Sequence, residues 1–102
     1  MYRILKTTEA EQDLINIWLY SYKNWGDRQA GKYLDGLEEG FKLLAVTPLL
    51  CRLRHEFIQP VRIHHHAHHL IIYDVLPGRI NIVRVLHESM DIETQLEEGS
   101  AG

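Results

Sequence analysis

The sequence predicts an α+β domain in which a helical hairpin packs on one face of a small antiparallel sheet. Two long stretches with apolar residues at helical spacing occupy the first half of the 102 residues, and three strand-like stretches follow in the second half. Helices gathered in one part of a chain and strands in another are typical of this fold class. A chain of this length forms one hydrophobic core, so residues 1–98 are interpreted as a single domain and residues 99–102 as a flexible tail.

The chain begins with a strand and a first helix. Residues 2–6 show the alternation of a short strand that joins the sheet. Thr8 and Glu11 have the spacing of a capping box, in which two side chains satisfy free amides of the first helical turn. Apolar residues then recur at helical spacing until Gly26, which predicts a helix over residues 9–25.

A second helix follows after a very short connection. Asp27 is expected to cap this helix, which ends before Pro48, and the short connection predicts an antiparallel hairpin. Gly36 and Gly40 lie inside the helix, where each costs about 1 kcal/mol relative to alanine. A close approach between backbones and a position facing solvent are the two explanations for these glycines. The apolar stripe comprises Ala30, Tyr33, Leu34, Leu37, Phe41, Leu44 and Ala45.

The second half of the chain predicts a loop and a three-stranded meander. Residues 47–60 have mixed polarity and prolines near both ends, which indicates an ordered loop with up to one helical turn. Strands are predicted over residues 61–65, 69–76 and 80–87. Residues 76–79 place proline and glycine at the centre of a tight turn between the last two strands.

A short helix is predicted at the end of the domain, over residues 90–98. Asp91 is available as its cap, and Ile92 and Leu96 lie four residues apart on one side of it.

Composition argues against several classes of protein. The net charge is -3 at pH 7, whereas binding to a nucleic-acid backbone depends on clustered lysine and arginine, so a protein partner is favoured. No apolar run approaches the ~20 residues of a membrane-spanning helix, and no signal peptide is recognised, which predicts a cytoplasmic protein without a membrane partner. Cys51 is the only cysteine and is interpreted as a small buried hydrophobe.

Histidines are concentrated at one turn. Five of the seven lie within residues 64–69. His64 and His66 project to the same side of a strand, and imidazole is the commonest transition-metal ligand, which raises the hypothesis of a metal site. The cluster straddles a turn, however, and acidic or cysteine ligands are not nearby in the sequence. We therefore predict no metal and no cofactor, and expect a solvated hairpin tip that gains positive charge below pH ~6.5 and makes partner binding pH-dependent.

Several motifs run almost from end to end of the chain. The first half contains EAEQDL at residues 9–14, Trp25-Gly26 and FKLLA at residues 41–45, and the second half contains Arg62, HLIIY at residues 69–73, IVRVLH at residues 82–87 and Met90-Asp91. In these motifs and in the order of its elements, the chain resembles the ParE branch of the RelE/ParE superfamily, the small toxins of bacterial toxin-antitoxin pairs.

The resemblance implies a fold of one strand, two helices and three strands, paired in a hetero-oligomer with a ParD-like antitoxin that wraps the toxin. ParE-like toxins are known as poisons of DNA gyrase that trap the cleaved DNA complex, and they are not themselves enzymes. The expected function is therefore inhibition of gyrase by binding, with a block of replication. Residues 64–68 depart from the phenylalanine-proline and glycine that such toxins often show there, and Cys51 stands where glycine is common, so the turn chemistry has changed.

Four of the five candidates for target binding lie at the end of the last predicted strand or just beyond it, and the fifth lies in the predicted strand over residues 61–65. They are Arg62, Arg84, His87, Met90 and Asp91. The nuclease branch of the superfamily offers the alternative function, a ribosome-dependent mRNA endonuclease that uses His87 as acid or base and Arg62 or Arg84 as the cation.

A structural role is the third interpretation of the same residues. In it, Arg84 pairs with a carboxylate such as Asp74 or Asp91, and His87 caps the strand end. Strict alternation places Arg84 on the face of Ile80, Ile82 and Leu86, opposite His87, unless the strand bends.

The antitoxin is expected to bind apolar surface of the helical hairpin. A hairpin on a small sheet leaves some apolar groups only partly covered, and an exposed groove or sheet edge can take a partner segment. The candidates are Trp18, Tyr22 and Trp25. A family member that has lost toxicity and survives as an antitoxin-binding module is a further alternative, and it predicts no growth arrest.

Overall fold

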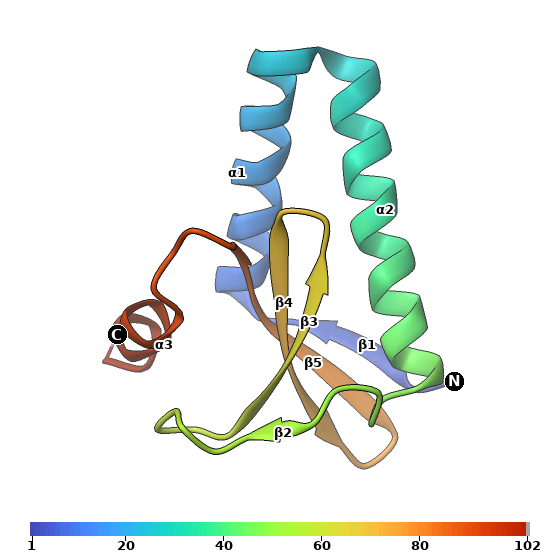
Figure 1. Cartoon of the computed structure of the whole chain (residues 1–102). Helices are drawn as coiled ribbons and strands as arrows, with labels where there is room; N and C mark the ends of the chain where they lie inside the picture. The colour runs from blue at the N-terminus through green and yellow to red at the C-terminus, as the bar shows by residue number, and fades with distance from the viewer. Residues whose placement is uncertain (102) are drawn as a thin grey trace.

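The computed structural model describes residues 1–101, with side chains through Glu97, and confirms the predicted α+β architecture (Figure 1). Helices α1 and α2 form an antiparallel hairpin above the sheet, and the two chain ends lie on opposite sides of the molecule (Figure 1). In chain order the described elements are β1 (Arg3–Lys6), α1 (Thr8–Trp25), α2 (Asp27–Val46), β2 (Leu53–Arg54), β3 (Val61–His66), β4 (His69–Leu76), β5 (Arg79–His87) and α3 (Ile92–Ala101).

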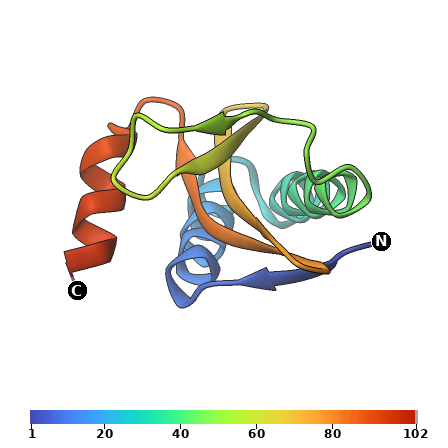
Figure 2. The same ribbon diagram turned by 90° about the horizontal axis from the view of Figure 1, so that it is seen from below.

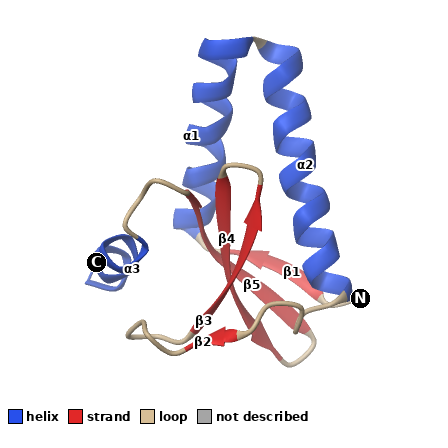
Figure 3. Cartoon of the chain, viewed as in Figure 1, coloured by secondary structure: helices blue, strands red, loops and turns tan. Residues whose placement is uncertain are grey.

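The described strands form one sheet in the order β1-β5-β4-β3-β2 (Figure 3). The meander of β3, β4 and β5 is antiparallel as predicted, and Gly78 has a φ of 74° in the turn between the last two strands. Strand β1 runs parallel to β5. Strand β2 was not predicted, because its two residues, which pair with Val61 and Arg62, are too few to show an alternating pattern.

Two of the predicted helix caps are wrong by one residue. The N-cap of α1 is Thr7 and not Thr8, because the Thr7 hydroxyl accepts a hydrogen bond from a first-turn amide at 3.0 Å and donates one to the Val83 carbonyl at 2.7 Å. This contact with β5 explains why Thr7, and not the neighbouring Thr8, caps the helix. Gly26, with a φ of 88°, occupies the cap position of α2, and Asp27 is the first residue of the helix.

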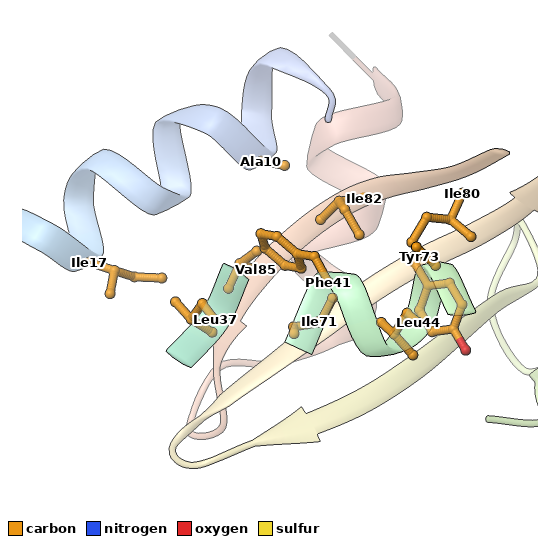
Figure 4. Packing of buried hydrophobic residues seen from close by; sticks show 11 residues of the cluster. Ala10, Ile17, Leu37, Phe41, Leu44, Ile71, Tyr73, Ile80, Ile82 and Val85 are labelled. Atoms are coloured by element: carbon orange, nitrogen blue, oxygen red, sulfur yellow. The ribbon is translucent and has the colours of Figure 1, made fainter. Parts of the chain in front are cut away.

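The main core fills the space between the hairpin and one face of the sheet (Figure 4). A smaller cluster on the opposite face contains Ile72 and Leu86 and packs against Ile92 and Leu96 of α3, which lies apart from the hairpin (Figure 2). The two clusters lie on opposite faces because Ile72 alternates with its core neighbours along β4. The main core comprises Ala10, Ile17, Leu37, Phe41, Leu44, Ala45, Ile71, Tyr73, Ile80, Ile82 and Val85.

Two glycines of α2 face the sheet closely. A Cβ atom at Gly36 would lie 3.1 Å from Nε2 of His66, and one at Gly40 would lie 3.2 Å from Cδ1 of Ile71. Of the two explanations for these glycines, the close approach therefore applies, although it is made with side chains and not with backbone.

Alanine substitutions at Gly31 and Gly40 are expected to change stability in opposite directions. Gly31→Ala should raise the free energy of unfolding by about 0.5–1 kcal/mol, because its Cβ meets nothing within 4 Å and alanine is the better helix former. Gly40→Ala should lower it by about 1–3 kcal/mol, because the fully buried Ile71 must move. Urea denaturation of both variants checks this; equal stabilisation by the two would contradict the close packing.

The C-terminal helix extends further than predicted. Its bounds are Ile92–Ala101, and Asp91, which precedes it, accepts a hydrogen bond from the Thr94 hydroxyl at 2.6 Å. Residues 99–101 of the expected tail fall within α3, and Gly102 lies outside the described residues. Over residues 1–101, none of the helices is both long and apolar enough to span a membrane.

Candidate functional site

A groove of about 600 Å³ opens between the helical hairpin and the adjoining ends of β4 and β5. Its wall is mainly apolar and aromatic, and histidines from the strand ends close one side of it. We call it the histidine groove, and its principal lining residues are Tyr20, Trp25, Tyr33, His69, His87 and Met90.

The C-terminal end of α1 supplies the aromatic wall of the histidine groove. Tyr20 and Trp25 contact each other edge to face, with ring centroids 5.7 Å apart, and each side chain is 62% exposed. Met90, beyond the end of β5, is 47% exposed in the same groove. Large apolar groups clustered in an open groove are typical of a surface that binds another protein.

A neutral hydrogen-bonded pair lies between α2 and the sheet in the histidine groove. The Tyr33 hydroxyl lies 2.6 Å from Nδ1 of His69, and the His69 ring contacts the His87 ring edge to face at 5.3 Å. Burial, reinforced by His87 and the neighbouring histidines, lowers the pKa of His69 to about 4. Burial raises the pKa of Tyr33. At neutral pH both groups are uncharged, so the Tyr33 hydroxyl can donate a hydrogen bond to Nδ1 of His69.

Glu88 joins the histidine turn to the end of β5. Its Oε2 lies 2.8 Å from Nδ1 of His68, and its Oε1 lies 3.4 Å from Nε2 of His65. The hydrogen bond from His68 lowers the pKa of Glu88. The turn is tight, with Ala67 at a φ of 51°. Both histidines are exposed, as expected for a hairpin tip, but they share a carboxylate partner.

The metal hypothesis receives no support from this geometry. Within the described part of the chain, no three histidine, cysteine, aspartate or glutamate side chains are placed to hold one metal ion. His64 lies 3.7 Å from the sulfur of Cys51, and His66 packs beside Gly36 and Gly40. Cys51 itself is only half buried and packs against the main core.

Arg84 is held by a carboxylate that the sequence analysis did not identify. Its Nε and Nη2 donate to the two oxygens of Asp13 at 2.7 and 2.9 Å, and the backbone N–H of Val85 donates to Asp13 at 3.0 Å. The expected partners, Asp74 and Asp91, are therefore wrong. A recognisable signal existed: helical spacing places Asp13 beside Ala10, Leu14 and Ile17 on the buried stripe.

An irregularity in β5 changes the face of the residues that follow it. Ile72 pairs with Arg84 and Tyr73 pairs with Ile82, so Val83 between them has no partner on β4. As a result, Ile82 and His87 both face the helical hairpin of α1 and α2, whereas Arg84 lies on the opposite face of the sheet, beside α3. The prediction that Arg84 and His87 lie on opposite faces is confirmed. The predicted placement of Arg84 on the face of Ile80 and Ile82 is wrong.

The predicted target-binding residues do not form a single site. His87 and Met90 line the histidine groove, and Asp91 precedes α3. Arg62 donates to the Cys51 carbonyl and pairs with Tyr73 of β4. His87 pairs with His69, which lies four residues before Tyr73 in the same strand. Four strand residues span about 13 Å. The His87 ring accepts a hydrogen bond from the Ser89 N–H at 3.1 Å, which agrees with its expected role at the strand end.

The predicted antitoxin-binding residues divide between two surfaces. Trp25 lines the histidine groove. Trp18 and Tyr22 stack on each other outside it, with ring centroids 5.1 Å apart, and Tyr22 is 49% exposed. Sequence reasoning missed Tyr20 and Tyr33, because only the fold brings α2 and the ends of β4 and β5 opposite the end of α1.

His69 should make stability fall as the pH is lowered. Because its folded pKa is about 4, below the usual 6.5, its contribution is complete above pH 6.5 and is lost progressively between pH 6.5 and 4. His69→Gln should therefore show a smaller loss of stability between pH 7.5 and pH 4.5 than the unchanged chain. Thermal unfolding at several pH values measures the difference, and parallel curves for the two proteins would contradict it.

Comparison with known proteins gives matches over nearly the whole chain. Residues 4–92 match the family described as the ParE toxin of type II toxin-antitoxin system, parDE. Toxin ParE1 of Mycobacterium tuberculosis is 34% identical over 95 residues, which cover 92% of this chain and 97% of the relative. Toxin ParE of Escherichia coli is 32% identical over 97 residues, with 94% of each chain covered.

A solved structure shares the fold. A chain of the chromosomal ParDE toxin-antitoxin system from P. aeruginosa superposes with a TM-score of 0.72 at 21% identity. The match covers 85% of this chain and 96% of the other.

Proposed function

The chain belongs to the ParE family of toxins of type II toxin-antitoxin systems, and on this premise we propose that it inhibits DNA gyrase by binding and is neutralised by a cognate antitoxin. The proposal places the protein in the cytoplasm, as one component of a toxin-antitoxin hetero-oligomer. Replication stops when the toxin is free, and toxicity is absent while the antitoxin is bound.

The observation that carries the proposal of a binding mechanism is the separation of the groups that catalysis would need. Arg84 is bound to Asp13 on the opposite side of the sheet from His87. Arg62 shares the sheet face of His87 but lies about four strand residues away from it and donates to the Cys51 carbonyl. Neither guanidinium lines the histidine groove beside His87. Cleavage of RNA needs a cation at the phosphate together with an acid and a base. An apolar groove in which the half-buried His69 is neutral fits a protein partner better than an RNA substrate.

The histidine groove is the proposed antitoxin-binding site. Its exposed aromatic residues, Tyr20 and Trp25, fit the apolar side chains of a partner segment. His87 and Met90, candidates for target binding, line the same groove, so an antitoxin seated there would cover them. In this account, neutralisation is direct competition for one surface. Trp18 and Tyr22 remain candidates for an additional contact on α1, and Arg62, Arg84 and Asp91 for additional target contacts.

Expression without the antitoxin tests the proposed target in cells. Incorporation of labelled thymidine should fall before incorporation of labelled methionine, because a poisoned gyrase stops replication first. Restoring the antitoxin gene should restore both. If protein synthesis stopped first, the ribosome would be the target, and continued growth would indicate an antitoxin-binding module without toxicity.

The endonuclease alternative makes a separate prediction about His87. A ribosome-dependent nuclease would cut mRNA in a translation extract, and His87→Ala would abolish the cuts. We expect intact mRNA with both proteins. Cuts made only by the unchanged chain would replace the gyrase proposal with the endonuclease.

A further inference from the structure

A second groove, of about 260 Å³, lies on the sheet face opposite the helical hairpin. It is bounded by α3, by residues 57–59 of the loop before β3 and by the beginning of α1. Figure 2 shows α3 beside the sheet at this place, away from α1 and α2. We call this second groove the acidic groove. The acidic groove is separate from the histidine groove, because none of the described residues lines both.

Asp74 is the central carboxylate of the acidic groove. It lies within β4, opposite Asn81 of β5, and its side chain is half buried. Among the described residues its carboxylate has neither a hydrogen bond nor an ion pair, and burial raises its pKa. A carboxylate that loses part of its hydration without gaining a partner costs stability, and nothing in the fold of β4 requires it.

Further acids surround Asp74. Glu9 lies in the first turn of α1 and Glu93 in the first turn of α3, where acidic side chains are favoured by the helix dipole. Glu97 adds a fourth carboxylate to the lining. Among the described lining residues the one cation is Arg84, which binds both oxygens of Asp13 and also donates to the Gln95 carbonyl. The described lining therefore has four carboxylates and one guanidinium, and this guanidinium also pairs with Asp13 outside the groove.

The floor between these carboxylates is apolar. Val61, Val83 and Leu96 line it, and Ile58 at its margin is 73% exposed. Lysine and arginine side chains combine an aliphatic stem with a charged head, and they commonly lay the stem on apolar surface while the head meets a carboxylate. The acidic groove presents these two features together.

We propose that the acidic groove binds a lysine or arginine side chain, with an adjoining apolar residue, from a polypeptide segment of a partner protein. The stem lies on Val83 and Leu96, and the head pairs with Asp74. Charge complementarity favours such a segment over an acidic one, and over a nucleic acid, whose phosphates the carboxylates repel. The inference does not depend on gyrase inhibition, because it concerns the opposite face of the sheet.

A pair of short peptides tests the proposal with the full chain. One is the capped peptide Gly-Leu-Arg-Val-Gly, and its twin carries citrulline, which has nearly the shape of arginine without the charge. Binding is followed by amide chemical shifts in NMR. The arginine peptide should bind at least fivefold more tightly than its twin and shift residues in β4, β5 and α3 around Asp74. Equal affinities, or shifts scattered over the whole surface, would overturn the proposal.

Two variants separate specific pairing from general attraction to an acidic protein. Asp74→Asn should reduce affinity for the arginine peptide at least fivefold, whereas Glu39→Gln, at an exposed position on α2, should change it less than twofold. Asp74→Asn should also raise the thermal midpoint slightly, because it removes an unpartnered, half-buried charge. A marked fall in that midpoint would assign Asp74 a structural role and overturn the proposal, as would equal effects of the two variants.

Discussion

Replacement of Asp13 by alanine is expected to lower the free energy of unfolding by about 3 kcal/mol, near the lower end of the range for breaking a buried ion pair. The Asp13 and Arg84 side chains are only 12% and 17% exposed. Asp13 accepts three hydrogen bonds, two from Arg84 and one from the Val85 N–H. Removal of this carboxylate leaves a guanidinium and a backbone donor without their shared partner.

A matched control separates this pairing from the general effect of removing a charge. Asp35→Ala, at an exposed position on α2, should change the free energy of unfolding by no more than about 0.5 kcal/mol. Urea denaturation of the two variants gives the comparison. If Asp13→Ala were as stable as Asp35→Ala, the pair would not hold α1 against β5 as described.

Replacement of Trp25 by alanine is expected to weaken binding of the cognate antitoxin by roughly 30-fold or more, because a central aromatic residue of an interface typically contributes about 2 kcal/mol or more. Trp25 is 62% exposed, so its loss should have little effect on folding. The expected result is therefore a large change in affinity with a nearly unchanged thermal midpoint. Calorimetric titration of the antitoxin into each variant measures it.

Leu49→Ala serves as the control for Trp25→Ala. Leu49 is 68% exposed but does not line the histidine groove, so its replacement should change antitoxin affinity less than about threefold. If Leu49→Ala weakened binding and Trp25→Ala did not, the antitoxin would bind elsewhere. Tyr22→Ala, measured in the same series, shows whether the neighbouring aromatic stack also takes part.

Local patterns were sufficient to predict most of the fold. Strand β4 was predicted over residues 69–76, and these are its bounds, because a nearly unbroken branched and aromatic run has no competing period. The ends of elements needed tertiary information. Thr7 caps α1 instead of Thr8 because its hydroxyl meets the Val83 carbonyl of β5, 76 residues away in the chain. The irregularity at Val83 changes the face of every later residue in β5, and alternation alone cannot predict it.

The candidate site was predicted only in part for the same reason. Trp25, His87 and Met90 were each identified from the sequence, but as members of two different sites. The structure places all three in the histidine groove with Tyr33. No local pattern relates the end of α1 to the end of β5. Asp13 was missed as the partner of Arg84 because acidic residues in a first helix have an ordinary explanation as solvent-facing charge. Helical spacing nevertheless places Asp13, unlike Glu9 and Glu11, on the buried stripe of the helix.

A titration of purified gyrase with the purified chain tests the central claim most directly. Supercoiling should decline and cleaved DNA should accumulate until the chain is about equimolar with the gyrase subunit that it binds, since inhibition by binding is stoichiometric. Equimolar antitoxin added beforehand should prevent both effects, and Trp25→Ala should require more antitoxin for the same protection. Undisturbed supercoiling at a large excess of the chain, together with cleavage of ribosome-bound mRNA at substoichiometric amounts, would contradict the account.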